Sequence, residues 1–362
     1  MSPHIHSGMS TGGIMLDVLI ALLPAAVAGV VIFGWRALLV IVVCVLSCVG
    51  FESLFNLLAK KQPTSGKWSI LLICVLGICL QEELVTKFPL MNTHYESISR
   101  VCVFALCGLV ILVKGIIEAK KTKAAPFGDL SAAVTGLLLA LNLPAGIPLW
   151  QCVVGSLFAI VLVKCLFGGL GQNVVNPAIA SRVFMLVAFS SMTQAAFPVG
   201  VDATAGATPL ANTAEMPGLL TLFTGNYGGA IGETCTAALL LGGIYLMARR
   251  VITWHNPTFF IATVFVFSLF MEGFDPLRAL SMVMCGGVVI GAIFMATDYV
   301  TSPPTPWGKV IFGIGCGLIT CLIRYFGNLP EGVSYAILFM NILNPYIMKW
   351  TKRKVFGTGG AK

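Results

Sequence analysis

Charged side chains are scarce in this sequence. Of its 362 residues, only 10% are Asp, Glu, Lys or Arg, whereas 57% are hydrophobic, and the mean hydropathy is +0.94. A soluble domain carries about a quarter of its residues as charged side chains. The scarcity excludes a soluble globular protein and predicts a chain that lies in lipid.

Several motifs that carry chemistry in soluble proteins are also missing. No two of the 12 cysteines have C-x-x-C spacing and nearly all lie inside apolar runs, which favours packing over disulfides or iron–sulfur ligation. The four histidines are too dispersed to predict a metal or haem site. The net charge of +8 comes in short clusters between apolar runs, which argues against nucleic-acid binding. A dinucleotide fingerprint and a nucleophile triad are absent too, so we expect no catalysis by this chain alone.

Apolar runs of nearly membrane-spanning length fill most of the chain. A transmembrane helix needs about 20 mostly apolar residues, and twelve stretches approach that length, which predicts about ten to twelve crossings. They are predicted at 15–34, 37–58, 67–81, 100–117, 130–143, 149–166, 178–195, 231–248, 252–270, 278–297, 309–326 and 333–349. The predicted fold class is an all-α polytopic membrane protein, in which 67–81 and 130–143 are short enough to be half-spans.

The basic residues fall on alternate loops between these runs. If residue 1 starts in the cytoplasm, the cytoplasmic loops collect Lys60-Lys61, Lys120-Lys121, Arg249-Arg250 and Lys352-Arg353-Lys354. The positive-inside rule then predicts that both termini are cytoplasmic. The long connection 196–230 contains no Lys or Arg, so it is predicted to face the opposite side.

The chain resembles itself at an offset that drifts along the sequence. The run from Gly136 to Trp150 is answered by Gly291 to Trp307, and Asn176-Pro177 is answered by Asn344-Pro345. This predicts an internal duplication, with a first membrane half over 1–195, the loop 196–230 and a second half over 231–362. Duplicated membrane folds commonly hold their site between the halves. The repeat by itself names no substrate.

One hydroxyl in the loop 196–230 stands among small residues, in the sequence Asp202-Ala-Thr-Ala-Gly206-Ala207-Thr208-Pro209-Leu210. Gly206 permits a tight turn, and Pro209 disfavours helix at Thr208. Small neighbours leave room for a bulky partner, so Thr208 is displayed. Composition alone describes only a turn-rich surface loop.

This loop resembles the flavinylation motif of the RnfD and NqrB family of membrane redox subunits. In that family a motif like D-x-x-[ST]-G-A-T accepts FMN through a phosphoester bond to its last threonine. Asp202, Gly206, Ala207 and Thr208 match the motif, and Ala205 stands where the family usually has Ser or Thr. The resemblance implies covalent FMN on Thr208.

The resemblance extends over most of the chain and is closest to the RnfD branch. It includes Ser2-Pro3-His4, Gly168 to Asn173, Ala296-Thr297-Asp298 and Pro330-Glu331-Gly332. The chain departs from the family in residues 64–126, which read as an extra hairpin with a polar outer tip from Gln81 to Arg100. The simplest interpretation of that hairpin is a peripheral element that contacts lipid or a partner subunit.

The resemblance implies an Rnf-type complex that couples electron flow to Na⁺ or H⁺ translocation. Its partners would be a second covalent-flavin subunit, iron–sulfur subunits and a flavin transferase. The location would be the bacterial cytoplasmic membrane, with 196–230 outside. Noncovalent riboflavin within the membrane region also belongs to the family pattern, and the sequence assigns no residues to it.

Ionisable residues inside the membrane usually face a bundle interior or a water path. The candidates in this sequence are Asp17, Asp129, Lys164, Arg182, Glu233, Asp298 and Lys309. For ion coupling we select Glu233, just inside the predicted span after the flavin loop, together with Asp298 and Asp129. Asp129 is equally suited to capping the helix that starts at Leu130.

Two other interpretations remain open at this point. A solute or ion transporter could use the duplicated bundle without flavin, with Thr208 as an ordinary loop residue. A structural scaffold that has lost its flavin is the third interpretation, which Ala205 keeps open. Retention of a fluorescent flavin after denaturation separates the flavin-carrying redox subunit from the transporter and from the scaffold.

Overall fold

The computed structural model describes residues 10–59, 71–87, 130–199, 209–211, 216–327, 329 and 331–352. The described residues are helical and contain no strand, and one isolated bridge joins Ala196 to Gly229. Three helices are long and apolar enough to cross a membrane, and a bent pair adds a fourth if it forms one span. The predicted all-α polytopic membrane fold is confirmed, while the number of crossings stays a prediction.

The helices fall into two sets joined by a connection that holds only short helices. The first set is α1 (Thr11–Phe33), α2 (Trp35–Leu58), α3 (Leu71–Lys87), α5 (Ser131–Leu141), α6 (Leu149–Leu157) with the π-helix η2 (Phe158–Cys165), and α7 (Pro177–Ala188). The connection holds η3 (Ser190–Thr193), η4 (Pro209–Ala211) and α8 (Leu219–Thr224). The second set is α9 (Thr236–Ala248), α10 (His255–Met271), α11 (Pro276–Met284), α12 (Val288–Ile290) with the π-helix η6 (Gly291–Met295), α13 (Pro306–Phe326) and α14 (Val333–Trp350).

Three helices begin at a polar residue followed by proline. Asn176, Asp275 and Thr305 each accept hydrogen bonds from backbone N–H groups of the first turn of α7, α11 and α13, and each is followed by proline. Proline suits this position because its missing N–H would have no partner in the helix. These local signals fix where three of the helices start.

α9 begins later than predicted. The sequence pattern placed a span over 231–248, but residues 231–235 form a connection before the helix. Ile231 and Gly232 donate their N–H groups to the carbonyls of Leu143 and Leu141, at 3.0 and 2.7 Å. Leu141 is the last residue of α5 and Leu143 lies just beyond it, where the final carbonyls of a helix have no partners within the helix. Glu233 therefore lies outside the helix rather than just inside it.

Three other predicted spans also differ from the structure. The span 278–297 is broken, with α11 and α12–η6 bent by 67°, because Gly286 adopts a φ of 73° that ends a helix. α7 stops at Ala188, well before the predicted end at 195. α3 continues to Lys87, so the first residues of the predicted polar tip after Gln81 are helical.

α1 and α9 run antiparallel where the two sets meet. At one end, the hydroxyl of Tyr245 donates to Asp17 at 3.0 Å; at the other, a Cβ on Gly29 would lie 2.5 Å from the Ile231 side chain. A Cβ on Gly242 would lie only 2.1 Å from the carbonyl oxygen of Ala21. Such close approach of small residues is how membrane helices associate.

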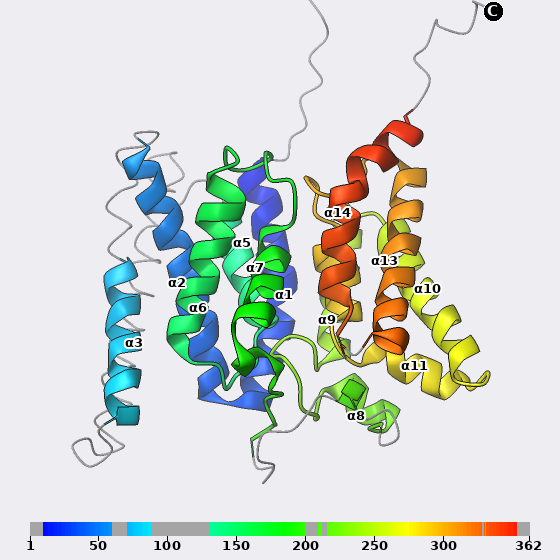
Figure 1. Ribbon diagram of the computed structural model, residues 1–362, viewed down its shortest axis with the longest axis horizontal. Helices are drawn as coiled ribbons and strands as arrows, with labels where there is room; N and C mark the ends of the chain where they lie inside the picture. The colour runs from blue at the N-terminus through cyan, green and yellow to red at the C-terminus, as the bar shows by residue number, and fades with distance from the viewer. Residues whose placement is uncertain are drawn as a thin grey trace, which may run out of the picture.

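Corresponding helices of the two sets run in opposite directions along the bundle. Figure 1 shows the C-terminal end of α14 at the top and α8 at the bottom, and Val199 near the start of the connection donates to Ile32 at the end of α1 (2.9 Å). α7 packs against α14 as α1 packs against α9. α7 leads into the connection that holds α8, whereas α14 ends at the opposite end of the bundle, so these two helices run in opposite directions, as in an inverted repeat. We call the end with α8 the outer end, and the end where α14 stops the inner end.

α3 lies at the edge of the bundle and packs against α2 and α6 (Figure 1). Its Glu82 pairs with Arg36 at the start of α2 and accepts a hydrogen bond from the backbone N–H of Leu149 at 2.9 Å. The remainder of the predicted hairpin 64–126 lies outside the described residues. The part that is described is thus fixed to the outer ends of two helices.

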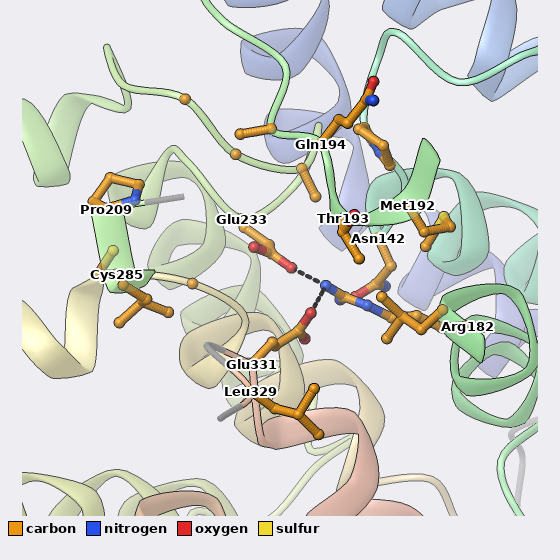
Figure 2. Close-up of a pocket in the computed structure, with 18 of the residues that line it drawn as sticks. Asn142, Arg182, Met192, Thr193, Gln194, Pro209, Glu233, Cys285, Leu329 and Glu331 are labelled. Carbon is orange, nitrogen blue, oxygen red and sulfur yellow. Dashed lines mark hydrogen bonds and ion pairs between the residues drawn. The ribbon is translucent and has the colours of Figure 1, made fainter. Parts of the chain in front are cut away.

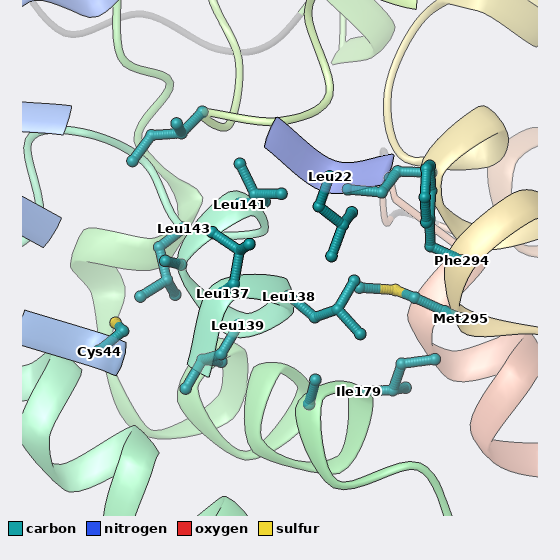
Figure 3. Close-up of a cluster of buried hydrophobic side chains, with 14 of the residues drawn as sticks. Leu22, Cys44, Leu137, Leu138, Leu139, Leu141, Leu143, Ile179, Phe294 and Met295 are labelled. Carbon is teal, nitrogen blue, oxygen red and sulfur yellow. The ribbon is translucent and has the colours of Figure 1, made fainter. Parts of the chain in front are cut away.

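A buried apolar cluster fills the junction of the two sets (Figure 3). Its labelled members are Leu22, Cys44, Leu137, Leu138, Leu139, Leu141, Leu143, Ile179, Phe294 and Met295. Two asparagines border this cluster, because the Asn142 amide donates to the sulfur of Met295 at 3.8 Å and the Asn176 amide donates to its carbonyl at 3.3 Å. The cluster separates two cavities, which face opposite ends of the bundle.

Candidate functional site

The larger cavity, which we call the outer cavity, has a volume of about 270 Å³. Residues from both sets and from the connection line it, among them Asn142, Arg182, Leu186, Met192, Pro209, Leu210, Tyr227, Glu233, Cys285, Leu329, Glu331 and Tyr335. Three of these carry charge and most of the others are apolar. A cavity with a few convergent polar groups in an apolar wall is the usual form of a ligand site.

Arg182 on α7 joins the charged residues of the outer cavity (Figure 2). Its Nη2 lies 2.5 Å from Oε1 of Glu233 and also pairs with Oε2 of Glu331, while its Nη1 donates to the amide oxygen of Asn142. The side chains of Arg182 and Glu233 are only 5% and 6% exposed. One guanidinium thus compensates two carboxylates, so the cluster carries one net negative charge when both are ionised.

Glu331 is the more exposed of the two carboxylates that contact Arg182. It lies in the connection between α13 and α14, where its side chain is 18% exposed. Burial raises the pKa of Glu331 to about 7, and the negative charge of Glu233 adds to the rise, although Arg182 opposes it. Near neutral pH this carboxyl group therefore exchanges a proton readily.

Backbone groups hold the other two members of the cluster. The Asn142 amide donates to the carbonyl of Leu138 at 2.6 Å, which fixes it at the end of α5. The Tyr227 hydroxyl lies 3.3 Å from the carbonyl of Glu233 and 3.5 Å from that of Met284. Glu233 is therefore positioned by the connection and by the end of α11, rather than by α9.

Pro209 and Leu210, together with Cys285 and Gly286, form the wall of the outer cavity opposite Arg182. A Cβ on Gly286 would lie 2.7 Å from Cδ1 of Leu210 and 3.0 Å from Nη2 of Arg324. Arg324 donates to the carbonyls of Met282 and Cys285, at 2.7 and 3.2 Å. Only a glycine at position 286 lets Leu210 and Arg324 meet the same stretch of backbone.

The second cavity, which we call the inner cavity, has a volume of about 110 Å³. It is lined by Met15, Ser131, Leu138, Lys164, Asn173, Asn176, Phe294, Asp298 and neighbouring residues. Lys164 in η2 donates to Glu52 and to Ser131, both at 2.5 Å. Asp298 accepts a hydrogen bond from the Thr301 hydroxyl at 3.0 Å, and burial raises its pKa.

Only one helical turn of α5 separates the two cavities. Leu138 lines the inner cavity and Asn142 the outer one, and four residues of α-helix rise about 6 Å. The gap is closed by the apolar cluster of Figure 3, in which Leu138, Ile179 and Met295 lie together. The two cavities thus approach each other from opposite ends of the bundle.

The structure pairs two of the ionisable residues selected from sequence, Arg182 and Glu233. It separates two of the ion-coupling candidates, because Glu233 lies in the outer cavity and Asp298 in the inner one. Thr208, Asp202, Gly206, Ala207 and Asp129 lie outside the described residues, so the flavinylation motif and the Asp129 cap stay predictions.

Sequence reasoning did not find the partners within the Arg182 cluster. Arg182 was one ionisable residue among several, and Glu331 appeared only within a motif. Both carboxylates lie far from Arg182 along the chain, at separations of 51 and 149 residues. The repeat was the one signal that could have suggested contacts between these segments.

Comparison with known proteins gives a consistent result. A sequence model of the NQR2, RnfD, RnfE family matches residues 1–86 and 78–357. The D subunit of the Na(+)-translocating ferredoxin:NAD(+) oxidoreductase complex of Acetobacterium woodii is 41% identical over 365 residues, covering 98% of this chain and 94% of that protein. The D subunit of the proton-translocating ferredoxin:NAD(+) oxidoreductase complex of Clostridium ljungdahlii is 35% identical over 379 residues, covering 99% and 95%. The D subunit of an ion-translocating oxidoreductase complex of Halorhodospira halophila is 30% identical over 397 residues, covering 98% and 94%.

Proposed function

Because this chain belongs to the NQR2, RnfD, RnfE family, we propose that it is the membrane subunit of an Rnf-type complex that couples electron transfer to ion translocation. It carries covalent FMN on Thr208. FMN accepts one or two electrons, so it links carriers of both kinds, while the protein supplies position and electrostatics. The proposed partners are a second covalent-flavin subunit and iron–sulfur subunits, with a flavin transferase that loads the FMN.

The observation that carries this proposal is the composition of the outer cavity. Its wall includes Pro209 and Leu210, which follow Thr208 directly in the chain, and its opposite side holds the Arg182 cluster. A flavin attached to Thr208 would therefore start beside the buried charges that join both halves. Electron transfer and ion movement would share one site.

The two cavities support an ion route along the junction of the halves. Asp298 lines the cavity at the inner end and Glu233 the cavity at the outer end. Acidic side chains at both ends and an apolar turn between them suit a path that stays closed to leakage and opens during turnover. The coupling ion is Na⁺ or H⁺, since the names of the relatives include both.

We propose the same orientation that the basic loops predict. The inner end, where α14 stops, faces the cytoplasm, and the outer end with α8 faces the outside of the cytoplasmic membrane. The segment 196–230 would then present Thr208 on the outside. The domain limits 1–195, 196–230 and 231–362 describe this arrangement.

The attachment of FMN is tested by expressing the full chain with a flavin transferase and running it on a denaturing gel under ultraviolet light. We expect a fluorescent band for the wild type and an FMN mass increment on the peptide from Asp202 to Leu210. Thr208→Ala should lose both signals, whereas Thr204→Ala and Thr213→Ala should keep them. A fluorescent Thr208→Ala would move the attachment site.

A transporter that uses the inverted repeat without flavin is the second candidate. The observation that favours it is the pair of cavities on either side of the junction, which is also the arrangement of alternating-access carriers. An unlabelled wild-type protein beside an active transferase, verified on a known flavin acceptor, would support this candidate and remove the redox proposal.

A further inference from the structure

A third cavity, which we call the interfacial cavity, lies at the inner end of the second set of helices and has a volume of about 230 Å³. Thr253 from the connection before α10, Pro303 from the connection before α13 and Lys309 in the first turn of α13 all line it. Its level is fixed by Thr305, whose hydroxyl donates to that of Thr351 at the end of α14, at 2.8 Å (top of Figure 1). The cavity thus lies where two connections of the inner end meet.

Tryptophans mark two levels along the bundle. Those of the described residues lie at helix ends, Trp35 and Trp150 at the outer end and Trp254, Trp307 and Trp350 at the inner end. All of them are between 41% and 75% exposed. Tryptophan is enriched at membrane–water interfaces, because its ring is apolar and its N–H needs a polar partner. The interfacial cavity, whose lining is adjacent in the chain to Trp254 and Trp307, therefore lies at the level of lipid headgroups.

The lining of the interfacial cavity contains one cation and no carboxylate. Lys309 donates one of its three N–H bonds to the hydroxyl oxygen of Thr253, at 2.9 Å. No carboxylate of the described residues forms an ion pair with Lys309. The Thr253 hydroxyl accepts the bond from Lys309 and keeps its own hydrogen for another acceptor. An ammonium group and a hydroxyl group thus offer donors side by side.

The other hydroxyl groups of the lining are already used within the protein. Thr297, Tyr299 and Ser302 each donate to a backbone carbonyl. The carboxylate of Asp298, which lies between two of them in the chain, accepts a hydrogen bond from Thr301 and lines the inner cavity instead. The donors of Lys309 and Thr253 therefore decide which ligand the cavity accepts, and they suit an anion.

The start of α10 adds partial positive charge beside these donors. α10 begins at His255, and its N-cap, Trp254, makes no side-chain hydrogen bond. The first N–H groups of a helix have no partner within the helix and attract anions. Asn256 in this turn lines the cavity, but its amide donates to the carbonyl of Ala296 and its oxygen turns toward Gly313, where a Cβ would lie 3.2 Å away.

We propose that the interfacial cavity binds the phosphate of an anionic phospholipid headgroup through the Lys309 ammonium and the Thr253 hydroxyl. A phosphate offers several oxygen acceptors, and basic pockets between membrane helices bind such headgroups. The inference is independent of the flavin in the proposed function. Because Val251, Thr297 and Tyr299 line both this cavity and the inner cavity, a bound headgroup also braces the wall of the inner cavity.

The proposal is tested by native mass spectrometry of the full-length chain, purified in detergent and stripped of lipid. The probes are phosphatidylglycerol, diacylglycerol with the same acyl chains, which lacks the phosphate, and inorganic phosphate as a competitor. The variants are Lys309→Met, Lys309→Arg and Thr253→Val. The matched control is Lys349→Met, which removes an exposed cation in the last turn of α14, at the same end but outside the cavity lining.

We expect the wild type to bind phosphatidylglycerol about tenfold more tightly than diacylglycerol, which is the contribution of one hydrogen bond to a charged group. Lys309→Met should lose this preference, and Thr253→Val should weaken it severalfold. Lys309→Arg keeps the charge and should keep most of the preference, while Lys349→Met should equal the wild type. Inorganic phosphate at the concentration of the lipid should leave phosphatidylglycerol bound.

Three results would overturn the proposal. The first is equal affinity of the wild type for both lipids, which would leave an acidic segment of a partner subunit as the occupant. The second is an equal loss in Lys309→Met and Lys349→Met, which would show attraction to charge anywhere at the inner end. The third is displacement of the lipid by inorganic phosphate, which would make free phosphate the ligand. If Lys309→Met does not fold, Thr253→Val replaces it in the comparison, and wild-type affinity in that variant would overturn the proposal.

Discussion

The outer and inner cavities both contain buried charge, but they compensate it in different ways. In the outer cavity, Arg182 is held by Glu233 and Glu331, which belong to the connection before α9 and to the connection before α14. In the inner cavity, Lys164 pairs with Glu52 from the same half. The outer cluster therefore joins the two halves, whereas the inner pair is complete within one of them.

This difference indicates which cavity responds to movement between the halves. If the halves shift relative to each other, Lys164 and Glu52 move together and keep their contact. Arg182 would change its distance to Glu331, which precedes α14 in the other half, whereas Glu233 follows Ile231 and Gly232, whose N–H groups bond to carbonyls at the end of the α5 segment. A displacement of the halves should therefore change the charge balance at the outer end and leave the inner pair intact.

The strongest test of this comparison is removal of the outer cation. Arg182→Met leaves Glu233 and Glu331 buried without their partner, which should cost about 3–5 kcal/mol of unfolding free energy. SDS titration of the purified chain measures this loss, and Arg182→Lys, which keeps the charge but not the paired geometry, should lose less. A change for Arg182→Met no larger than that of an exposed substitution would contradict the importance of the cluster.

Removal of the inner cation should cost less. Lys164→Met leaves Glu52 unpaired, but that side chain is 17% exposed and can turn toward water, so we expect a loss of about 2–3 kcal/mol. Because both charges belong to one half, the double variant Lys164→Met with Glu52→Gln should recover part of the loss. The same SDS titration measures both variants, and a double variant as unstable as the single one would show that the pair is not an independent unit.

Most helices could be predicted from the sequence because their signals are local. Apolar runs located α1, α2, α10 and α13 within a few residues, and the cap of α7 could be predicted from Asn176-Pro177. The start of α9 could not, since Ile231 and Gly232 use their N–H groups on carbonyls at the end of α5. A local sequence pattern cannot predict that the end of a distant helix supplies these carbonyl acceptors.

The candidate site was predicted only in part, for the same physical reason. Asp298 could be selected because it is an ionisable residue at the end of an apolar run, and its partner Thr301 is only three residues away. The pairing of Arg182 with Glu331 depends on how the inverted halves meet, and periodicity contains no information on that contact. Glu233 was selected for its position in the chain, while its function in the structure comes from Arg182.

The pH dependence of stability tests the carboxylate that is shared across the halves. Glu331 has a pKa of about 7 in the folded protein, above the value of about 4.3 for an exposed glutamate. Its protonated form is thus favoured by folding, and this contribution, present below pH 4.3, is lost as the pH rises through 7. Between pH 5 and 8 the wild type should lose about 1–3 kcal/mol relative to Glu331→Gln.

Unfolding of both proteins by SDS at a series of pH values measures this difference. Tyr245→Phe serves as a control at the inner end, because it removes a hydroxyl that donates to Asp17 and leaves Glu331 unchanged. Its pH profile should follow that of the wild type. Parallel profiles for wild type and Glu331→Gln would mean that Glu331 is ionised throughout the range.

The smallest effect is expected where the halves are joined by a pair whose cation is exposed. Arg249 on the second half lies 3.3 Å from Asp17 on α1; its side chain is 58% exposed, whereas that of Asp17 is 9% exposed and also accepts a hydrogen bond from the Tyr245 hydroxyl. Exposed ion pairs contribute about 0.2–1 kcal/mol and weaken in salt, so Arg249→Ala should cost less than 1 kcal/mol, and the cost should vanish at high ionic strength in the same titration. A loss as large as that of Arg182→Met would mean that joining the halves, rather than burial, gives a charge pair its strength. A small loss assigns that strength to burial, and among the ion pairs of the described residues it is then the outer cluster that combines both properties.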